Sequence, residues 1–255
     1  MITIFHQLPH LEAYGNPQYF FYLILAVLPV FIGLFFKLRF PIYEALVSLA
    51  FIILMLTGKD LNQIISLLAY VVWQVVLVFA YQLYRKKYDN NWVFYISVFL
   101  AILPLAWTKV TPLMTIDNHQ SLFGFLGISY LTFRAVGTIM EVRDGVLKEF
   151  SPWQFLRFML FMPTFSSGPI DRFNRFNEDY ENIPERDELL DMLEESVHYL
   201  MLGFLYKFIL AYIFGTLLLV PLKEMALQMG GIFNIATLGV MYTYGLDLFF
   251  DFAGY

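Results

Sequence analysis

FMPTFSSGPIDRF, residues 161–173, interrupts an apolar part of the chain and places two charged residues directly behind the interruption. Its two prolines cannot continue an α-helix, because proline lacks the backbone N–H and its ring clashes with the preceding turn. Non-helical backbone at membrane depth is tolerated only where protein buries it or where it lines a water-filled cavity. The stretch therefore predicts a broken helix over residues 162–170 that borders a polar hollow, with Asp171 and Arg172 at its mouth. The alternative is an ordinary interfacial turn between two helices.

The composition places this interruption in a membrane protein. Hydrophobic residues make up 59% of the 255 residues and charged residues only 15%, and the mean hydropathy is +0.64. Soluble chains contain about 45–50% apolar and about 25% charged residues, so this chain has too few charges to cover a soluble surface. We expect an all-α, polytopic integral membrane protein that forms one transmembrane domain over residues 1–255.

The same composition excludes several kinds of site. The chain has no cysteine, so disulfides, a thiolate nucleophile and cysteine-based metal centres are excluded. The four histidines form no pattern with metal-ligand spacing, and we predict no metal site. Nucleic-acid binding needs a basic patch interleaved with aromatic residues, and neither such a patch nor a strongly basic net charge is present, since the net charge is -5.

Seven apolar runs approach the length of about 20 residues that a helix needs to cross a bilayer. They cover residues 19–36, 41–56, 61–83, 92–107, 122–140, 197–219 and 232–255. Basic residues follow the first run (Lys37 and Arg39) and the third (Arg85 to Lys87), and such residues mark the cytoplasmic side. The sequence therefore predicts a multi-pass protein of the cell membrane whose N-terminus lies outside.

A short helix precedes the interruption. Ser151, Pro152 and Gln154 occupy the N-cap, N1 and N3 positions of a capping box. The apolar run from Trp153 to Phe165 is too short to span, so we expect an interfacial, re-entrant or buried segment. If it re-enters the membrane, it returns to the cytoplasmic side. Beyond the charged segment that follows, apolar residues at helical spacing predict an amphipathic surface helix that continues into the span at residues 197–219.

A second polar constellation lies in YGLDLFFDFAGY, residues 244–255. Tyr244, Asp247, Asp251 and Tyr255 fall on one face of a helix that is otherwise apolar. Two carboxylates within a span are costly, and they are expected to face a cavity or a charged partner. The candidate partners are Lys207, Arg134 and Arg172. A buried structural ion pair is the alternative to a functional role.

These two constellations, in this order, resemble the membrane-bound O-acyltransferase family. FMPTFSSGPIDRF is similar to its phenylalanine–proline–x4–Gly-Pro-Ile signature, and YGLDLFFDFAGY to its tyrosine-rich, Asp-containing helix. The resemblance implies a ring of transmembrane helices around a funnel, with a broken or re-entrant helix. The residues implied to border the funnel and the substrate path are Ser166, Ser167, Gly168, Pro169, Arg172, Tyr244, Asp247 and Asp251. The family's catalytic histidine is implied to lie beyond Tyr255.

The resemblance is strongest to the branch that transfers D-alanine in the Gram-positive cell envelope. It implies a donor thioester on the phosphopantetheine arm of a cytoplasmic D-alanyl carrier protein. It also implies an acceptor outside, either lipoteichoic acid or an intermediate, and other membrane proteins of the same pathway as partners. A thioester is already activated, so this step needs no bound cofactor, but it needs a base and a tunnel. Alginate-type O-acetyl transfer is the alternative within the family.

Two readings from other classes remain open. Transporters and channels also use broken helices and carboxylates inside the membrane, although many show an internal repeat, and we find none. A non-catalytic membrane scaffold is the third interpretation. The chain stops within an apolar helix without a polar tail, whereas membrane helices usually end with a cap or a snorkelling charge. We therefore expect the polypeptide to continue past Tyr255 as the front part of a longer protein.

Overall fold

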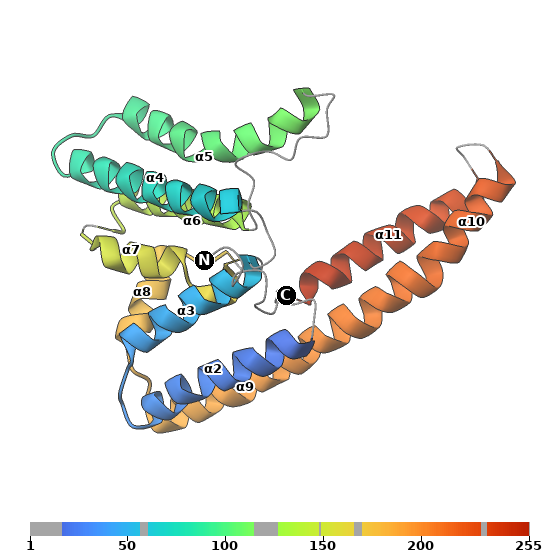
Figure 1. Ribbon diagram of the computed structural model, residues 1–255, viewed down its shortest axis with the longest axis horizontal. Coiled ribbons are helices and arrows are strands. Elements are labelled where there is room, and N and C mark those ends of the chain that lie inside the picture. Colours follow the sequence, from blue (N-terminus) through green and yellow to red (C-terminus); the bar gives the residue numbers. More distant parts are fainter. Residues whose placement is uncertain are drawn as a thin grey trace. The chain divides into compact units, whose positions relative to one another are not determined.

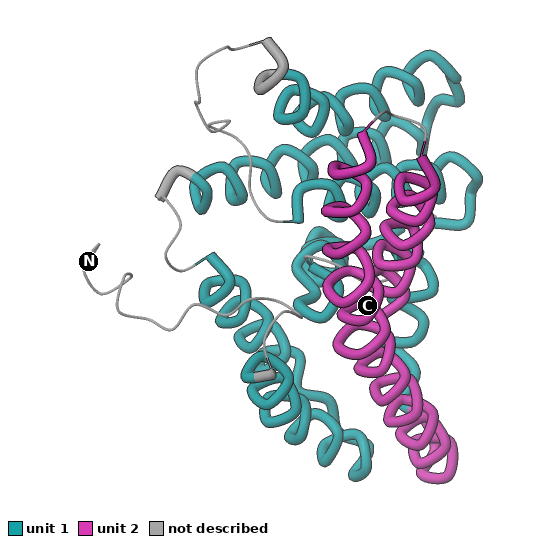
Figure 2. Tube along the Cα trace, turned by 90° about the vertical axis from the view of Figure 1, so that its right-hand side faces the viewer, with its two compact units in different colours: residues 1–183 teal, residues 184–255 magenta. Residues whose placement is uncertain are grey.

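The computed structural model describes residues 17–56, 61–114, 127–147, 149–165, 170–230 and 234–254. The chain divides into two compact units, Met1–Ile183 and Pro184–Tyr255, which Figure 2 distinguishes by colour. Every regular element within the described ranges is helical. This confirms the all-α prediction, and the two units are described separately below.

Unit 1 contains seven α-helices and one short 3₁₀-helix among its described residues (Figure 1). They are α2 (Pro17–Phe35), α3 (Pro41–Leu56), α4 (Leu61–Arg85), α5 (Asn91–Met114), α6 (Ile128–Arg143), α7 (Pro152–Met159), η1 (Met162–Thr164) and α8 (Phe173–Glu181). The first four helices match the first four predicted runs, although α5 continues seven residues further. Residues 122–126 of the fifth predicted run lie outside the described ranges.

Among the described residues, four helices are long and apolar enough to cross a membrane, namely Gln18–Phe35, Gln63–Arg85, Asn91–Val110 and Arg186–Met229. The apolar helix Pro41–Leu56 is shorter. Many large apolar side chains on these helices are exposed in the protein, among them Phe21, Val72 and Phe99. Outward-facing apolar residues of this kind are what a lipid environment requires. These features define a polytopic membrane protein.

The core of unit 1 forms where α6 packs against α4 and α5. One face of α6 is fully buried, including Leu131, Ala135 and Ile139. An aromatic cluster continues this core into α7 and α8, because the Phe173 ring lies 5.4 Å from Phe158 and 4.9 Å from Phe150 between ring centroids. Helix α8 was not predicted as a separate helix. Its charged residues conceal the two phenylalanines, Phe173 and Phe176, that attach it to the core.

Unit 2 is a helical hairpin. Its first arm runs from residue 186 to residue 229 and consists of α9 (Arg186–Phe204), two π-helical segments η2 (Leu205–Leu210) and η3 (Ile213–Leu218), and α10 (Leu219–Met229). The second arm is α11 (Ile235–Ala253), which lies beside the first in both views (Figures 1 and 2). Helix α11 begins at Asn234, whose side-chain oxygen accepts a 2.7 Å hydrogen bond from the Thr237 N–H.

The first arm confirms the predicted continuation of an amphipathic helix into an apolar span. Its end differs from the prediction, because the helix continues ten residues beyond Leu219. The added residues are mostly good helix formers. Pro221 lies in the first turn of α10, directly after the π segment η3, and the first turn is where a helix tolerates proline.

Candidate functional site

The short helix α7 begins as predicted. The Ser151 N–H donates to Gln154 Oε1 at 2.7 Å, and the Gln154 N–H donates to Ser151 Oγ at 3.2 Å. Pro152 occupies the first helical position. The reciprocal bonds satisfy two backbone N–H groups that a helix start otherwise leaves without partners. The capping box therefore determines where α7 begins.

Arg134 determines how α7 ends. Its Nη1 donates to the carbonyl oxygens of Phe158 at 2.7 Å and Met159 at 3.1 Å, and its Nη2 donates to the Thr164 carbonyl at 2.7 Å and to the Thr164 hydroxyl. The side chain is buried in α6. The final carbonyls of a helix have no partner within it and carry partial negative charge, so a guanidinium satisfies both needs. Arg134 thus holds the interrupted backbone against α6.

A close backbone approach supports the same arrangement. Gly127 precedes α6 with φ of 92°, and a Cβ at this position would lie 2.6 Å from the Phe165 carbonyl oxygen. Only glycine combines that conformation with that contact. In the described part of the predicted interruption, the backbone forms a 3₁₀ turn at residues 162–164. Ser166, Ser167, Gly168 and Pro169 of the predicted site lie outside the described residues.

Behind the interruption, Arg172 lines a hollow of about 380 Å³. The other lining residues are Glu141, Val146, Ile170, Asp171, Asn174 and Arg175. Asp171 Oδ1 accepts bonds from the Arg172 N–H at 2.7 Å and from Arg175 Nη2 at 2.8 Å. The charges predicted at the mouth of a hollow therefore lie beside one.

Glu141 belongs to the same hollow and was not predicted. Its Oε2 accepts a 3.2 Å bond from the Asn174 N–H in the first turn of α8. Burial raises the pKa of Glu141, and the Asn174 N–H and the Arg172 charge oppose that rise. The sequence contained only a lone carboxylate near the end of an apolar run, so nothing in it pointed to α8 as the partner.

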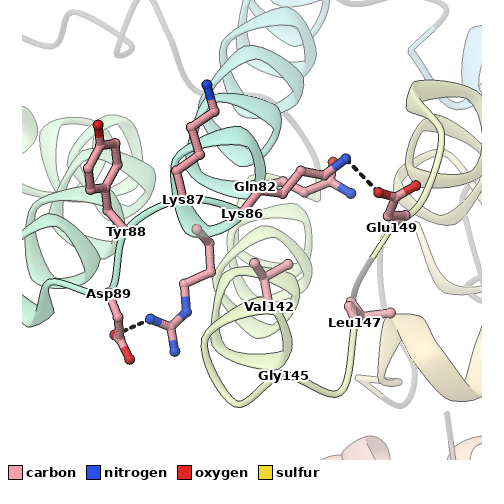
Figure 3. Close-up of a pocket in the computed structure, with 10 residues that line it drawn as sticks. Gln82, Lys86, Lys87, Tyr88, Asp89, Val142, Gly145, Leu147 and Glu149 are labelled. Carbon is pink, nitrogen blue, oxygen red and sulfur yellow. Dashed lines mark hydrogen bonds and ion pairs between the residues drawn. The ribbon is translucent and has the colours of Figure 1, made fainter.

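A larger polar hollow of about 690 Å³ lies where α4 ends, next to the segment that follows α6 (Figure 3). Lys86 Nζ pairs with Glu149 Oε1 at 2.8 Å, and this contact lowers the pKa of Glu149. Arg85 pairs with Asp89, and its Nη2 donates to the Arg143 carbonyl at 3.0 Å. The basic residues 85–87 were used only to orient the protein, although they also line this hollow.

Unit 2 contains the second predicted constellation. Lys207 Nζ donates to Asp251 Oδ1 at 2.6 Å, which selects Lys207 from the three candidate partners for this carboxylate. Lys207 lies in the π segment η2, and such segments occur frequently at functional sites. Arg134 and Arg172, the other two candidates, make the unit 1 contacts given above.

Asp247 lies against Gly215 of η3. A Cβ at Gly215 would lie 2.7 Å from the Asp247 carboxyl carbon, so the missing side chain provides the space for this carboxylate. Tyr244 is exposed in the same helix, with 53% of its surface accessible. Tyr255, the fourth residue of the predicted face, lies outside the described residues. Asp251 therefore has one of the expected charged partners, Lys207, whereas Asp247 lies against the glycine at position 215.

The helices and the interrupted segment together define an all-α polytopic membrane protein. No family model matches the chain. It is 68% identical over 255 residues to the teichoic acid D-alanyltransferase of Streptococcus thermophilus, 51% identical over 253 residues to that of Lacticaseibacillus rhamnosus, and 40% identical over 248 residues to that of Bacillus subtilis. These matches confirm the resemblance, drawn from the two constellations, to proteins that transfer D-alanine.

These matches cover nearly all of this chain but a smaller share of each relative. They include 100%, 96% and 95% of this chain but 61%, 62% and 61% of the three relatives. The chain therefore spans about three fifths of the length of the curated relatives it matches.

Proposed function

We propose that the whole protein transfers D-alanine from a carrier-protein thioester on the cytoplasmic side to lipoteichoic acid, or to an intermediate acceptor, on the outside. The observation that carries this proposal is the identity of 40–68% to proteins named teichoic acid D-alanyltransferase, over nearly all of this chain. Other membrane proteins of the Dlt pathway and the carrier protein are the proposed partners.

The proposed reaction is acyl transfer. An acceptor hydroxyl loses its proton to a base and its oxygen attacks the thioester carbonyl. The C–S bond then breaks, and the phosphopantetheine thiol leaves with a proton. The thioester provides the activation, so the protein has to orient the two substrates and exclude water between them. Hollows bordered by charged groups and rigidly held backbone are suited to that task.

The proposed orientation places the N-terminus outside and the basic connections in the cytoplasm. Contacts between connections support the part of this proposal that places the basic connections on one common side. Lys86, after α4, bonds to Glu149, between α6 and α7. Arg39, between α2 and α3, donates to the carbonyl oxygens of Asp179 at 3.0 Å and Asn182 at 2.8 Å, at the end of α8. Connections that touch must lie on one side of a membrane, and all four of these segments were assigned to the same side.

We propose that Arg172 borders the substrate path at the hollow behind the interruption, and that Asp247 and Asp251 shape an inner wall. The Lys207–Asp251 ion pair supports a wall role for Asp251, because it holds the carboxylate in one position. Asp247 is supported by its fit against Gly215. We propose the same path for Ser166, Ser167, Gly168, Pro169 and Tyr244.

The test uses the full-length protein in vesicles with a D-alanyl-loaded carrier. Asp247→Asn keeps the shape that fits Gly215 but removes the charge, and Arg172→Ala removes the charge at the hollow. Each should lower the initial rate of D-alanine transfer about tenfold, the effect of losing about 1.4 kcal/mol of transition-state stabilisation. Asp191→Asn, which changes an exposed carboxylate on α9, is the matched control.

Normal transfer rates in both variants, with membrane insertion equal to the control, would remove these residues from the path. Absence of any D-alanine transfer by the unmodified full-length protein, with an intact carrier thioester, would contradict the proposed function itself.

A further inference from the structure

Asp247 differs from the other carboxylate of α11 in having no charged partner within the described residues. It makes neither an ion pair nor a hydrogen bond with any of them, whereas Asp251, one turn later, is paired with Lys207. Its surroundings are apolar, since Leu248 and Phe249 beside it are exposed hydrophobic side chains. A lone charge in an apolar part of a membrane protein is costly, and such residues mark substrate or ion pathways.

The ion pair of unit 2 removes Asp251 from consideration as a cation site. Lys207 Nζ lies 2.6 Å from Asp251 Oδ1, and only 12% of the Lys207 side chain is exposed. The backbone of α11 also approaches closely here, because a Cβ at Gly254 would lie 2.8 Å from Lys207 Cβ. The lysine therefore has little freedom to turn away from Asp251. Its charge cancels that of Asp251, and the net negative charge of the pair and Asp247 together resides on Asp247.

The position of the Asp247 carboxylate is fixed before any ligand arrives. A Cβ at Gly215 would lie 2.7 Å from its carboxyl carbon and 2.9 Å from Oδ2, so the carboxylate occupies space that another residue would fill. Next to this contact the rings of Phe214 and Phe250 are stacked, with centroids 5.4 Å apart, and they hold α11 against η3. Asp247 is only partly buried. It is therefore a preorganised acceptor that a small group can reach.

The chemistry of the carboxylate restricts its ligand. An ionised carboxylate only accepts hydrogen bonds, and its uncompensated charge favours a cation that carries N–H donors. The D-alanyl group is joined to its carrier through the carboxyl carbon, so its amino group is free. An α-amino group has a pKa of about 7.7–8.0 and is largely protonated at neutral pH. The proposed donor thus presents an ammonium group directly beside the carbonyl that reacts.

We propose that Asp247 determines which acyl group is transferred, by pairing with the α-ammonium of the D-alanyl group. Lys207 is a positioning residue in this arrangement, because it neutralises Asp251 and leaves one carboxylate for one ammonium. The inference rests on the proposed D-alanine transfer and names the part of the substrate that this wall recognises. The pairing leaves the chemical step unchanged: the C–S bond breaks, the C–O bond forms, and the ammonium keeps its proton.

The same charge distinguishes the two acyl groups that the sequence left open. A D-alanyl group is cationic, whereas an acetyl group is neutral and offers no donor to a carboxylate. The cost of keeping Asp247 ionised in apolar surroundings is offset only by a substrate of opposite charge. Asp247 therefore favours D-alanyl transfer over alginate-type O-acetyl transfer.

The test compares two donors, with the full-length protein in vesicles. One carrier is loaded with D-alanine and the other with D-lactate, in which a neutral hydroxyl replaces the ammonium. The measured quantity is the ratio of the two initial transfer rates. We expect the unmodified protein to prefer D-alanyl about tenfold, in keeping with the loss of one charged hydrogen bond. Asp247→Asn should remove this preference, because it slows D-alanyl transfer and not D-lactyl transfer.

Two controls separate charge recognition from damage to the protein. Lys207→Met combined with Asp251→Asn removes both charges of the ion pair at once, so it should leave the ratio unchanged although both rates fall. Asp191→Asn, on the exposed surface of α9, should change neither rate. Should Asp247→Asn fail to fold, Gly215→Ala provides a second variant, because its methyl group displaces the Asp247 carboxylate and should also lower the ratio.

A rate ratio that is unchanged in Asp247→Asn and in Gly215→Ala would overturn this proposal. Equal rates with the two donors in the unmodified protein would overturn it as well, because they would show that the ammonium is not recognised. Transfer of neither acyl group by the unmodified protein, with both carrier thioesters intact, would instead contradict the proposed function itself.

Discussion

Arg134 illustrates how one side chain can hold an irregular backbone inside a membrane protein. Its guanidinium donates to the carbonyls of Phe158, Met159 and Thr164 and to the Thr164 hydroxyl. The sequence shows a charge inside an apolar run, which makes Arg134 one of three candidate partners for Asp247 and Asp251. The acceptors named here are backbone groups of a segment 24 to 30 residues later, and no pattern of residue types announces them.

We expect Arg134→Met to destabilise the full-length protein by about 3 kcal/mol or more, because it leaves several buried carbonyls without their donor. Arg134→Lys keeps the charge but reaches fewer acceptors, and should have an intermediate effect. The measurement is the melting temperature of the detergent-purified variants. A melting temperature of Arg134→Met equal to that of the unmodified protein would show that these bonds do not stabilise the interrupted segment.

The buried Glu141 should make the stability of the folded protein depend on pH. Its pKa is raised by burial, so the folded protein binds this proton more tightly than the unfolded chain does. The stabilisation is therefore complete below the unfolded pKa near 4.5 and is lost as the pH rises through the folded pKa. Glu141→Gln keeps an oxygen for the Asn174 N–H without the charge. Its melting temperature relative to the unmodified protein should be higher at pH 8 than at pH 4.5.

Glu149→Gln is the control for this measurement. Lys86 lowers the pKa of Glu149, so the pH dependence of the stabilisation is opposite to that of Glu141. The ionised Glu149 carboxylate stabilises the folded protein at pH values above its unfolded pKa. This stabilisation is lost as the pH falls through the lowered pKa of the folded state. The exposed position makes the effect small. If the melting temperatures of Glu141→Gln and the unmodified protein differ by the same amount at both pH values, burial does not raise the pKa of Glu141.

At the scale of the element, most helices were predictable because their apolar runs are long and are punctuated by charged residues. Helix α3 begins and ends where the sequence predicted. The π segments η2 and η3 were not predictable. Both segments contact α11: Lys207 of η2 forms an ion pair with Asp251, and Gly215 of η3 lies against Asp247. Because α11 follows later in the chain, the local sequence of η2 and η3 does not reveal these contacts.

Helix α7 has only eight residues, and a helix of this length is not stable in isolation. Its N-terminal capping box is therefore expected to contribute measurably to its stability. Ser151→Ala removes the side-chain oxygen that accepts from the Gln154 N–H, and it should cost about 1 kcal/mol. We expect a lower melting temperature and faster amide exchange in the first turn of α7. Ser196→Ala, which changes an exposed serine on α9, should have no comparable effect. Equal exchange in both variants would contradict the capping role.

At the scale of the molecule, the direction of the chain through the membrane was predicted from a few basic residues. The contacts between connections of unit 1 agree with the assignment of these segments to one common side, whichever side that is. The site was less predictable. The sequence identified Arg172, Asp247 and Asp251 as polar residues in an apolar setting. Glu141 could not be identified, because its partner Asn174 belongs to α8, which meets α6 only in the folded chain.

The predicted orientation can be checked with single cysteines, since these 255 residues contain none. Asp89→Cys should react with a membrane-impermeant maleimide only after the cells are permeabilised, because Asp89 follows the basic residues at the end of α4. Lys59→Cys lies in a connection assigned to the outside and should react in intact cells. The opposite pattern of labelling would show that the protein has the inverse orientation.

The bonds made by Arg134 have a consequence for biosynthesis. A ribosome adds about 5–20 residues per second, and the last of the acceptors described here, Thr164, follows Arg134 by 30 residues. For roughly 2–6 seconds after Arg134 is made, the nascent chain must accommodate a guanidinium without these acceptors. A lone arginine at the centre of a membrane helix opposes insertion by about 2.5–3.5 kcal/mol on the translocon scale. Helix α6 is thus expected to wait at the translocon and to enter the bilayer together with α7 and the turn that follows it.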